Sequence, residues 1–91
     1  MNKNELVGEV AARLGMSKSD SQSAVDAVFD VIEGALKNGD EVRVTGFGSF
    51  VVTERKASTG RNPRTGEAIE IPASRQPKFR AGKTLKDAVN G

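Results

Sequence analysis

The chain has 91 residues, a net charge of +2, and neither cysteine nor histidine. A chain this short allows one domain with a thin core, and oligomerisation is a natural source of extra stability for it. Without cysteine there can be no disulfide, cysteine-type zinc site or thiol nucleophile, and without histidine an active site would have to use carboxylates, Lys or Ser. We therefore expect no enzyme activity, no catalytic residue, no metal and no cofactor.

The first segment is predicted to be a short amphipathic helix. Asn2 followed by Glu5 forms a capping-box pattern, in which each side chain can satisfy a free backbone donor. Apolar residues then recur at helical spacing as far as Leu14, and Gly15 supplies the left-handed stop.

A second and longer helix is predicted from Ser17, which repeats the capping signature with Asp20, to about residues 38–39. Its apolar residues fall into two adjacent rows, and together they form a stripe too wide for one short partner helix to cover. The rows are Val25, Val28, Phe29, Ile32 and Leu36, and Ala24, Ala27, Val31 and Ala35. A second copy of the chain is the simplest cover, so we predict a homodimer with this helix in the interface.

From residue 40 the apolar period changes to two, which is typical of strands. Val42 and Val44 alternate with charged residues, a Gly-Phe-Gly turn is expected to direct the Phe47 ring inward, and a second strand follows. Residues 78–80 are predicted to form a short returning strand with Phe79 inward, before a small closing helix. The expected class is α+β: a helical base with a three-stranded antiparallel sheet.

The polar run at residues 53–77 cannot lie inside a folded body, because it holds five basic and three acidic residues and little that is large and apolar. Its flanks alternate as strands, and its centre reads Gly60-Arg61-Asn62-Pro63-Arg64-Thr65-Gly66. Asn, Pro and Gly in that order are typical of a turn. We therefore predict a long β-ribbon arm that projects from the sheet.

The net charge is divided unevenly along the chain. Residues 1–52 carry five basic and eight acidic side chains, a charge of −3, whereas residues 53–91 carry nine basic and four acidic ones, a charge of +5. Such asymmetry predicts an anionic partner for the second half, which would be nucleic acid or an acidic surface.

Four separated blocks resemble the bacterial HU family of histone-like DNA-binding proteins, which includes integration host factor. They are Met1-Asn2-Lys3-Asn4-Glu5-Leu6-Val7, Thr45-Gly46-Phe47-Gly48-Ser49-Phe50, residues 60–66, and Phe79-Arg80-Ala81-Gly82-Lys83-Thr84-Leu85-Lys86-Asp87-Ala88-Val89. The resemblance implies one HU-type domain over residues 1–91: a helical dimerisation part at 1–39, a sheet at 40–81 with its arm at about 53–77, and a C-terminal helix at 82–91. It also implies an intertwined homodimer, or a heterodimer with a related chain, that binds double-stranded DNA and prefers bent, nicked or distorted forms.

HU and integration host factor are themselves the established examples of proteins that kink DNA from the minor groove, so the mechanism comes with the resemblance. It implies that Pro63 intercalates between base pairs. The expected arm contacts are Arg55, Lys56, Arg61, Asn62 and Arg64, with the amide of Asn62 offered to base acceptors. The expected phosphate contacts are Lys3, Lys18, Arg75, Lys78, Arg80 and Lys83. Taken singly, solvated surface explains Lys3, Lys18 or Lys83 equally well.

Function is thus expected to be architectural and largely independent of sequence: DNA condensation and bending by a bacterial, cytoplasmic, nucleoid-associated protein without a membrane segment. The arm has fewer charges than in many relatives, with Ser58 on its outward strand and Glu67-Ala68 after its tip. A sequence-specific bending factor of the integration host factor type is the first alternative. A basic arm that docks on an acidic protein or membrane surface is the second, and phenylalanines that stack on single-stranded bases are a third.

Overall fold

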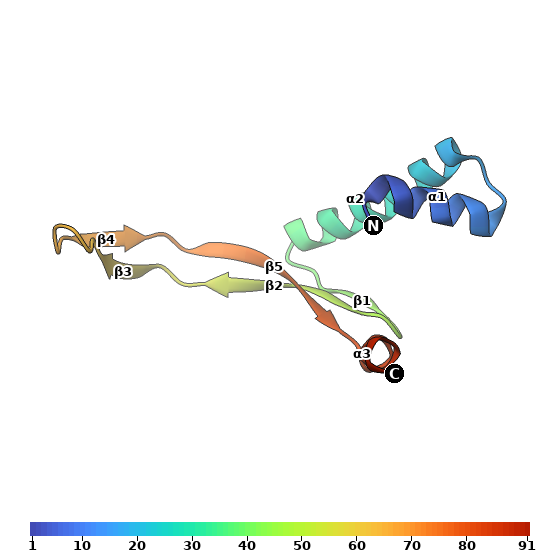
Figure 1. The fold of residues 1–91 in the computed structure, drawn as a ribbon. Coiled ribbons are helices and arrows are strands. Elements are labelled where there is room, and N and C mark those ends of the chain that lie inside the picture. The colour runs from blue at the N-terminus through green and yellow to red at the C-terminus, as the bar shows by residue number, and fades with distance from the viewer. The chain divides into compact units, whose positions relative to one another are not determined.

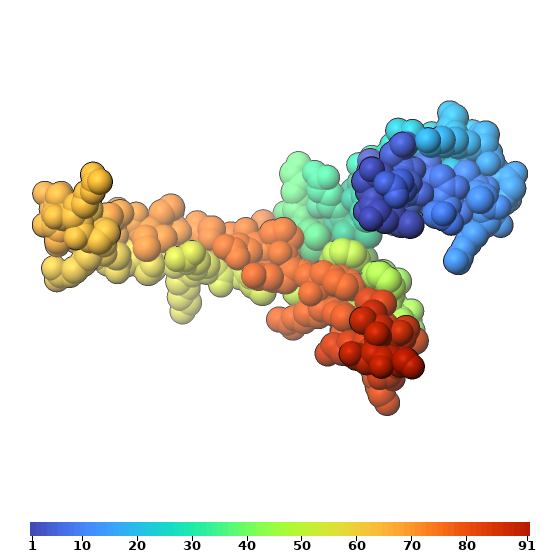
Figure 2. Space-filling view, in the orientation of Figure 1, coloured from blue at the N-terminus to red at the C-terminus, as the bar shows by residue number.

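The computed structural model describes all 91 residues and divides into two units, Met1–Ala35 and Leu36–Gly91. Figure 1 draws them as a ribbon and Figure 2 as space-filling atoms. The first unit is helical. The second holds the end of the second helix, all the strands and the last helix. No helix of the chain has both the length and the apolar character needed to cross a membrane.

The first helix, α1 (Lys3–Leu14), has the ends that its sequence predicts. The backbone N–H of Glu5 donates to Oδ1 of Asn2 at 2.8 Å, which satisfies one of the donors left free at a helix start. At the other end Gly15 has φ +62°, the left-handed conformation that ends many helices. The sequence prediction for this helix is confirmed.

The second helix, α2 (Lys18–Lys37), begins where Ser17 accepts a hydrogen bond from the N–H of Asp20 at 3.1 Å. Its first half packs on α1 through Val25 and Ser21, which are buried together with Val7 of α1. Farther along, the apolar stripe is open: Val31 is 71% and Val28 57% exposed in the isolated chain. Exposure of that size on a helix needs a partner surface.

The sheet of the second unit has the strand order β1–β2–β5, and both pairs are antiparallel. Its strands are β1 (Val42–Val44), β2 (Gly48–Arg55) and β5 (Ser74–Ala81), and the helix α3 (Lys83–Asn90) follows. The returning strand is longer than the sequence pattern indicates, because every residue from Ser74 to Ala81 is paired with β2.

The outer part of the arm is a separate two-stranded ladder of β3 (Ser58–Arg61) and β4 (Ala68–Ile71). Between the two ladders, residues 56–57 and 72–73 are unpaired. Pro72 has no N–H to donate, which is one reason for this break. In Figure 1 the arm extends as a thin ribbon from the sheet, and Figure 2 shows that no other part of the second unit covers its tip.

Three aromatic rings gather where the sheet meets α3. Phe50 and Phe79 are direct cross-strand partners with ring centroids 4.9 Å apart, and the Phe47 ring lies 5.5 Å from that of Phe79. The rings contact one another as predicted, yet Phe47 and Phe79 remain 46% and 44% exposed in the single chain. The rings therefore form a surface cluster, and a single chain does not complete the core around them.

Candidate nucleic-acid interface

The tip of the arm is closed by a compact set of hydrogen bonds centred on Asn62. Its N–H donates to the carbonyl oxygen of Glu67, and its own carbonyl oxygen accepts from the N–H of Gly66, both at 2.8 Å. Gly66 has φ +72°, which explains the glycine at that position. The side-chain Oδ1 of Asn62 accepts from the N–H of Arg64 at 2.9 Å, so an Asx turn encloses Pro63.

Pro63 is therefore presented as a rigid apolar corner. It is exposed, its ring fixes φ, and the hydrogen bonds that close the turn all belong to its neighbours. A side chain of this kind loses little conformational entropy when it is inserted into another molecule, because proline has almost none to lose.

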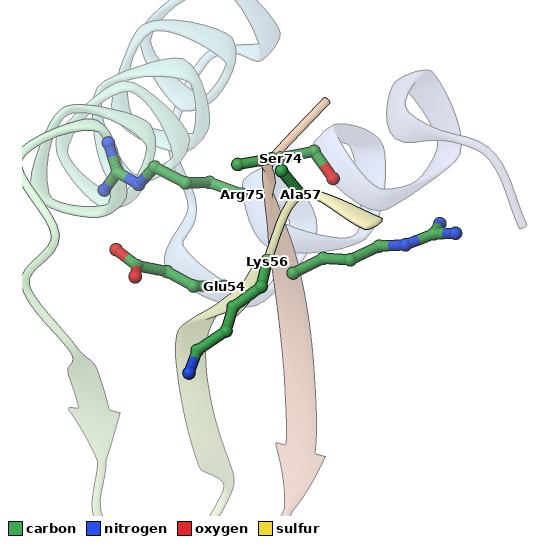
Figure 3. A pocket seen from close by; sticks show the side chains of 7 residues that line it. Glu54, Lys56, Ala57, Ser74 and Arg75 are labelled. Atoms are coloured by element: carbon green, nitrogen blue, oxygen red, sulfur yellow. The ribbon is translucent and has the colours of Figure 1, made fainter. Parts of the chain in front are cut away.

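Two arginines and one lysine stand along the arm. Arg61 donates from Nη1 to the carbonyl oxygen of Gly66 at 3.3 Å, which braces the tip turn while leaving its other donors free. Arg64 is exposed beside Pro63. Lys56 lies in the unpaired break and lines, with Arg55, a depression between the two ladders (Figure 3).

The sheet register places three of the predicted cations on one face. Alternate residues of a strand point to opposite faces, so Arg80 and Lys78 share a face, and the pairing of Arg55 with Ser74 puts Arg55 on it as well. All three are exposed. They form a positive row that runs from the sheet to the root of the arm, which is an arrangement suited to the regular charges of a polyanion.

Arg75 has a different position, which sequence reasoning did not foresee. It lies on the opposite face, paired with Glu54, and Figure 3 shows both side chains on the same side of the ribbon. Its guanidinium donates to the carbonyl oxygens of Leu36 and Lys37 at the end of α2. Arg75 thus caps a helix, and it stays a phosphate candidate only through the donors that this capping leaves unused.

Lys3 of the first unit forms an ion pair with Asp26 of α2. A side-chain hydrogen bond and the charge of Asp26 raise the pKa of Lys3, with a smaller contribution from Asp30 and against a small opposing effect of desolvation. A phosphate would compete with Asp26 for this ammonium. Lys18 and Lys83 are exposed in the first turns of α2 and α3, and no hydrogen bond or ion pair within the chain occupies either ammonium.

Two further cations belong with these sets. Arg43 of β1 pairs with Ser49, which pairs with Arg80, so Arg43 and Arg80 lie in one row across the sheet. The alternation of β1 would have indicated this outward position. Lys86 follows Lys83 by three positions on α3, and this spacing brings two side chains to the same side of a helix.

An exposed basic arm with a rigid apolar tip, rooted in a sheet with a cationic face, defines a protein that grips a polyanion. The family model described as "Bacterial DNA-binding protein" matches residues 1–90. This chain belongs to that family of bacterial DNA-binding proteins, which includes HU, as the resemblance implied.

Individual relatives agree over their whole length. The DNA-binding protein HRm of Rhizobium meliloti is 62% identical over 90 residues, which are 99% of this chain and 100% of that protein. DNA-binding protein HU 1 of Bacillus subtilis is 59% identical over 91 residues, covering 100% of this chain and 99% of the relative.

Solved structures agree in fold as well. The HU chain in an Anabaena HU–DNA cocrystal structure superposes with a TM-score of 0.87 at 46% identity, covering 98% of this chain and 97% of that one. HU from Thermotoga maritima superposes with a TM-score of 0.69 at 32% identity, covering 98% of each chain. The α+β fold with an extended arm predicted from the sequence is thus confirmed.

Proposed function

We propose that this chain is an architectural DNA-binding protein that acts as a homodimer, bends and compacts double-stranded DNA with little sequence preference, and is associated with the bacterial nucleoid in the cytoplasm. The observation that carries the proposal is the exposed Pro63, held at the corner of a hydrogen-bonded turn at the end of a basic two-stranded arm. The HU relatives, one of them in a complex with DNA, support it.

The homodimer follows from what a single chain leaves uncovered. Val28, Phe29 and Val31 of α2 are exposed, and so are Phe47 and Phe79 of the aromatic cluster. Burying such side chains contributes about 1.5–3 kcal/mol each, so association of two copies strongly stabilises the fold. A dimer also carries two arms, and two arms can enclose a duplex where one could only touch it.

The division of labour between the cations and the tip follows from their chemistry. Arginine and lysine side chains on the sheet face and along the arm neutralise phosphates, which favours binding to any sequence and makes affinity dependent on salt. Pro63 supplies an apolar wedge. Partly unstacking a base step costs a few kcal/mol, and this cost is offset by contacts that only a bent duplex can make with the rest of the dimer.

A gel-shift series with linear, nicked and four-way DNA at several salt concentrations tests the proposal. Nicked and four-way DNA should bind more tightly than linear DNA, because less energy is needed to bend them, and every affinity should fall steeply as salt rises. Equal affinity for stiff and pre-kinked duplexes would contradict an architectural role.

The same preparation separates the alternatives. Strong protection of one motif in footprinting, against none on random DNA, would favour a sequence-specific bending factor. A partner that still co-purifies after nuclease treatment would favour docking on an acidic protein, and binding to anionic vesicles would favour a membrane surface. We assign the chain no enzymatic activity, since the relatives it matches are named for DNA binding.

A further inference from the structure

The hydrogen bond from the N–H of Arg64 to the side chain of Asn62 fixes more than the shape of the turn. A backbone N–H can only donate, so the atom of the Asn62 amide that faces it must be the oxygen, Oδ1, at 2.9 Å. The other end of the amide is then the NH₂ group. It makes no hydrogen bond within the chain, and it directly precedes the exposed Pro63.

The tip therefore offers a hydrogen-bond donor beside its wedge, and its acceptor is already occupied. In the minor groove an A·T pair presents only acceptors, adenine N3 and thymine O2, whereas a G·C pair adds the donor N2 amino group of guanine. An NH₂ group finds a partner on the first kind of edge. On the second it meets another donor, and one of the two is left without a partner.

We propose that Asn62 is a specificity-determining residue, whose locked amide makes each arm tip favour base pairs without a minor-groove amino group next to the kinked step. The inference rests on the proposed function, since it requires the tip to lie in the minor groove. Phosphate contacts and the proline wedge remain indifferent to sequence, so the preference is modest and confined to the pairs beside each kink.

The test uses the full-length dimer and duplexes with one nick, which localises the kink. The base pairs flanking the nick are A·T, G·C, inosine·C or diaminopurine·T in otherwise identical DNA. Inosine lacks the N2 amino group of guanine, and diaminopurine adds one to adenine, so affinity should follow that group. We expect G·C and diaminopurine·T flanks to bind about threefold to tenfold more weakly than A·T and inosine·C flanks, the size of one lost hydrogen bond.

Two variants distinguish the amide from the turn that holds it. Asn62→Asp keeps an oxygen for the N–H of Arg64 but has no donor, so its A·T to G·C affinity ratio should fall to one or reverse, whatever its added charge does to overall affinity. Asn62→Ala should lose the discrimination as well. Wild-type protein that ignores the N2 amino group, or an Asn62→Asp variant that keeps the wild-type ratio, would overturn the inference while leaving architectural binding intact. Failure to bind any of the duplexes would overturn the proposed function itself.

Discussion

Arg75 joins the root of the arm to the end of α2: its Nη2 donates to the carbonyl oxygen of Leu36 at 3.2 Å, and its Nη1 donates to that of Lys37 at 3.3 Å. The last carbonyls of a helix have no partner within it, so a guanidinium there satisfies groups that water would otherwise have to solvate. Gly39, at φ +82°, leaves the space, since a Cβ on it would lie 3.4 Å from Nη2.

We predict that Arg75→Ala lowers the free energy of unfolding by about 0.5–1.5 kcal/mol, the usual range for a hydrogen bond that is partly exposed to water. Urea denaturation at one fixed protein concentration measures the loss, because the stability of a dimer depends on concentration. Arg75→Lys should lose nearly as much, since a single ammonium cannot reproduce the two-pronged contact.

Arg80→Ala is the matched control, on the same strand but on the opposite face. It should leave the unfolding free energy nearly unchanged while weakening binding to DNA and lowering the slope of log affinity against log salt by about one. If Arg75→Ala instead altered the salt slope and not the stability, Arg75 would be a phosphate contact as the sequence first suggested.

Most local structure could be predicted because its causes are local. The caps at Asn2, Gly15 and Ser17 depend on neighbours within three or four residues, and so does the turn around Pro63. The charge pattern identified the arm for the same reason: a run so polar cannot be buried, whatever surrounds it.

What sequence reasoning missed depends on distant partners. The capping role of Arg75 joins positions 39 residues apart in the chain, and no local pattern distinguishes it from Arg80. The returning strand was predicted too short, because Gln76 and Pro77 do not look like a strand until β2 is paired with them. The unpaired residues between the two ladders also escaped notice, since both flanks alternate without interruption.

Gly48 provides a test of the packing beside the aromatic cluster. A Cβ at this position would lie 2.6 Å from the carbonyl oxygen of Arg80 and 2.7 Å from the Phe79 ring. We predict that Gly48→Ala destabilises the protein by about 1–3 kcal/mol, as overpacking does elsewhere, measured by urea denaturation. Gly8→Ala is the control: this glycine is inside α1 and its Cβ would meet nothing within 4 Å. It should stabilise the helix by about 0.5–1 kcal/mol, and equal losses in both variants would contradict the steric account.

The pair of Lys3 with Asp26 predicts a specific pH dependence. The hydrogen bond and charge of Asp26 raise the pKa of Lys3 above its ordinary value of 10.5. A cation with a raised pKa stabilises the folded state fully below the ordinary value, and this contribution is lost as pH rises through the raised one. Asp26→Asn should therefore melt at a lower temperature than wild type at neutral pH, and the difference should shrink above about pH 10.5.

Direct titration of the Lys3 side chain by NMR checks the cause. Asp26→Asn should bring the pKa of Lys3 down towards its ordinary value, and Asp30→Asn should do so less, because Asp30 acts only through its charge and contributes less. A Lys3 pKa that is the same in Asp26→Asn as in wild type would show that the ion pair is not formed in solution.

Pro63 carries the last prediction, which separates bending from binding. Pro63→Ala removes the wedge but none of the hydrogen bonds that close the turn, since these belong to Asn62, Arg64, Gly66 and Glu67. Phosphate contacts persist, so affinity for already nicked DNA should change by no more than about threefold, whereas the bend induced in intact duplexes should fall clearly. Energy transfer between dyes at the two DNA ends measures the bend. Pro72→Ala, also on the arm but at the break between its ladders, should bend DNA as wild type does. A Pro63→Ala variant with the wild-type bend would remove the tip proline from the mechanism and leave the arms to bend DNA by charge alone.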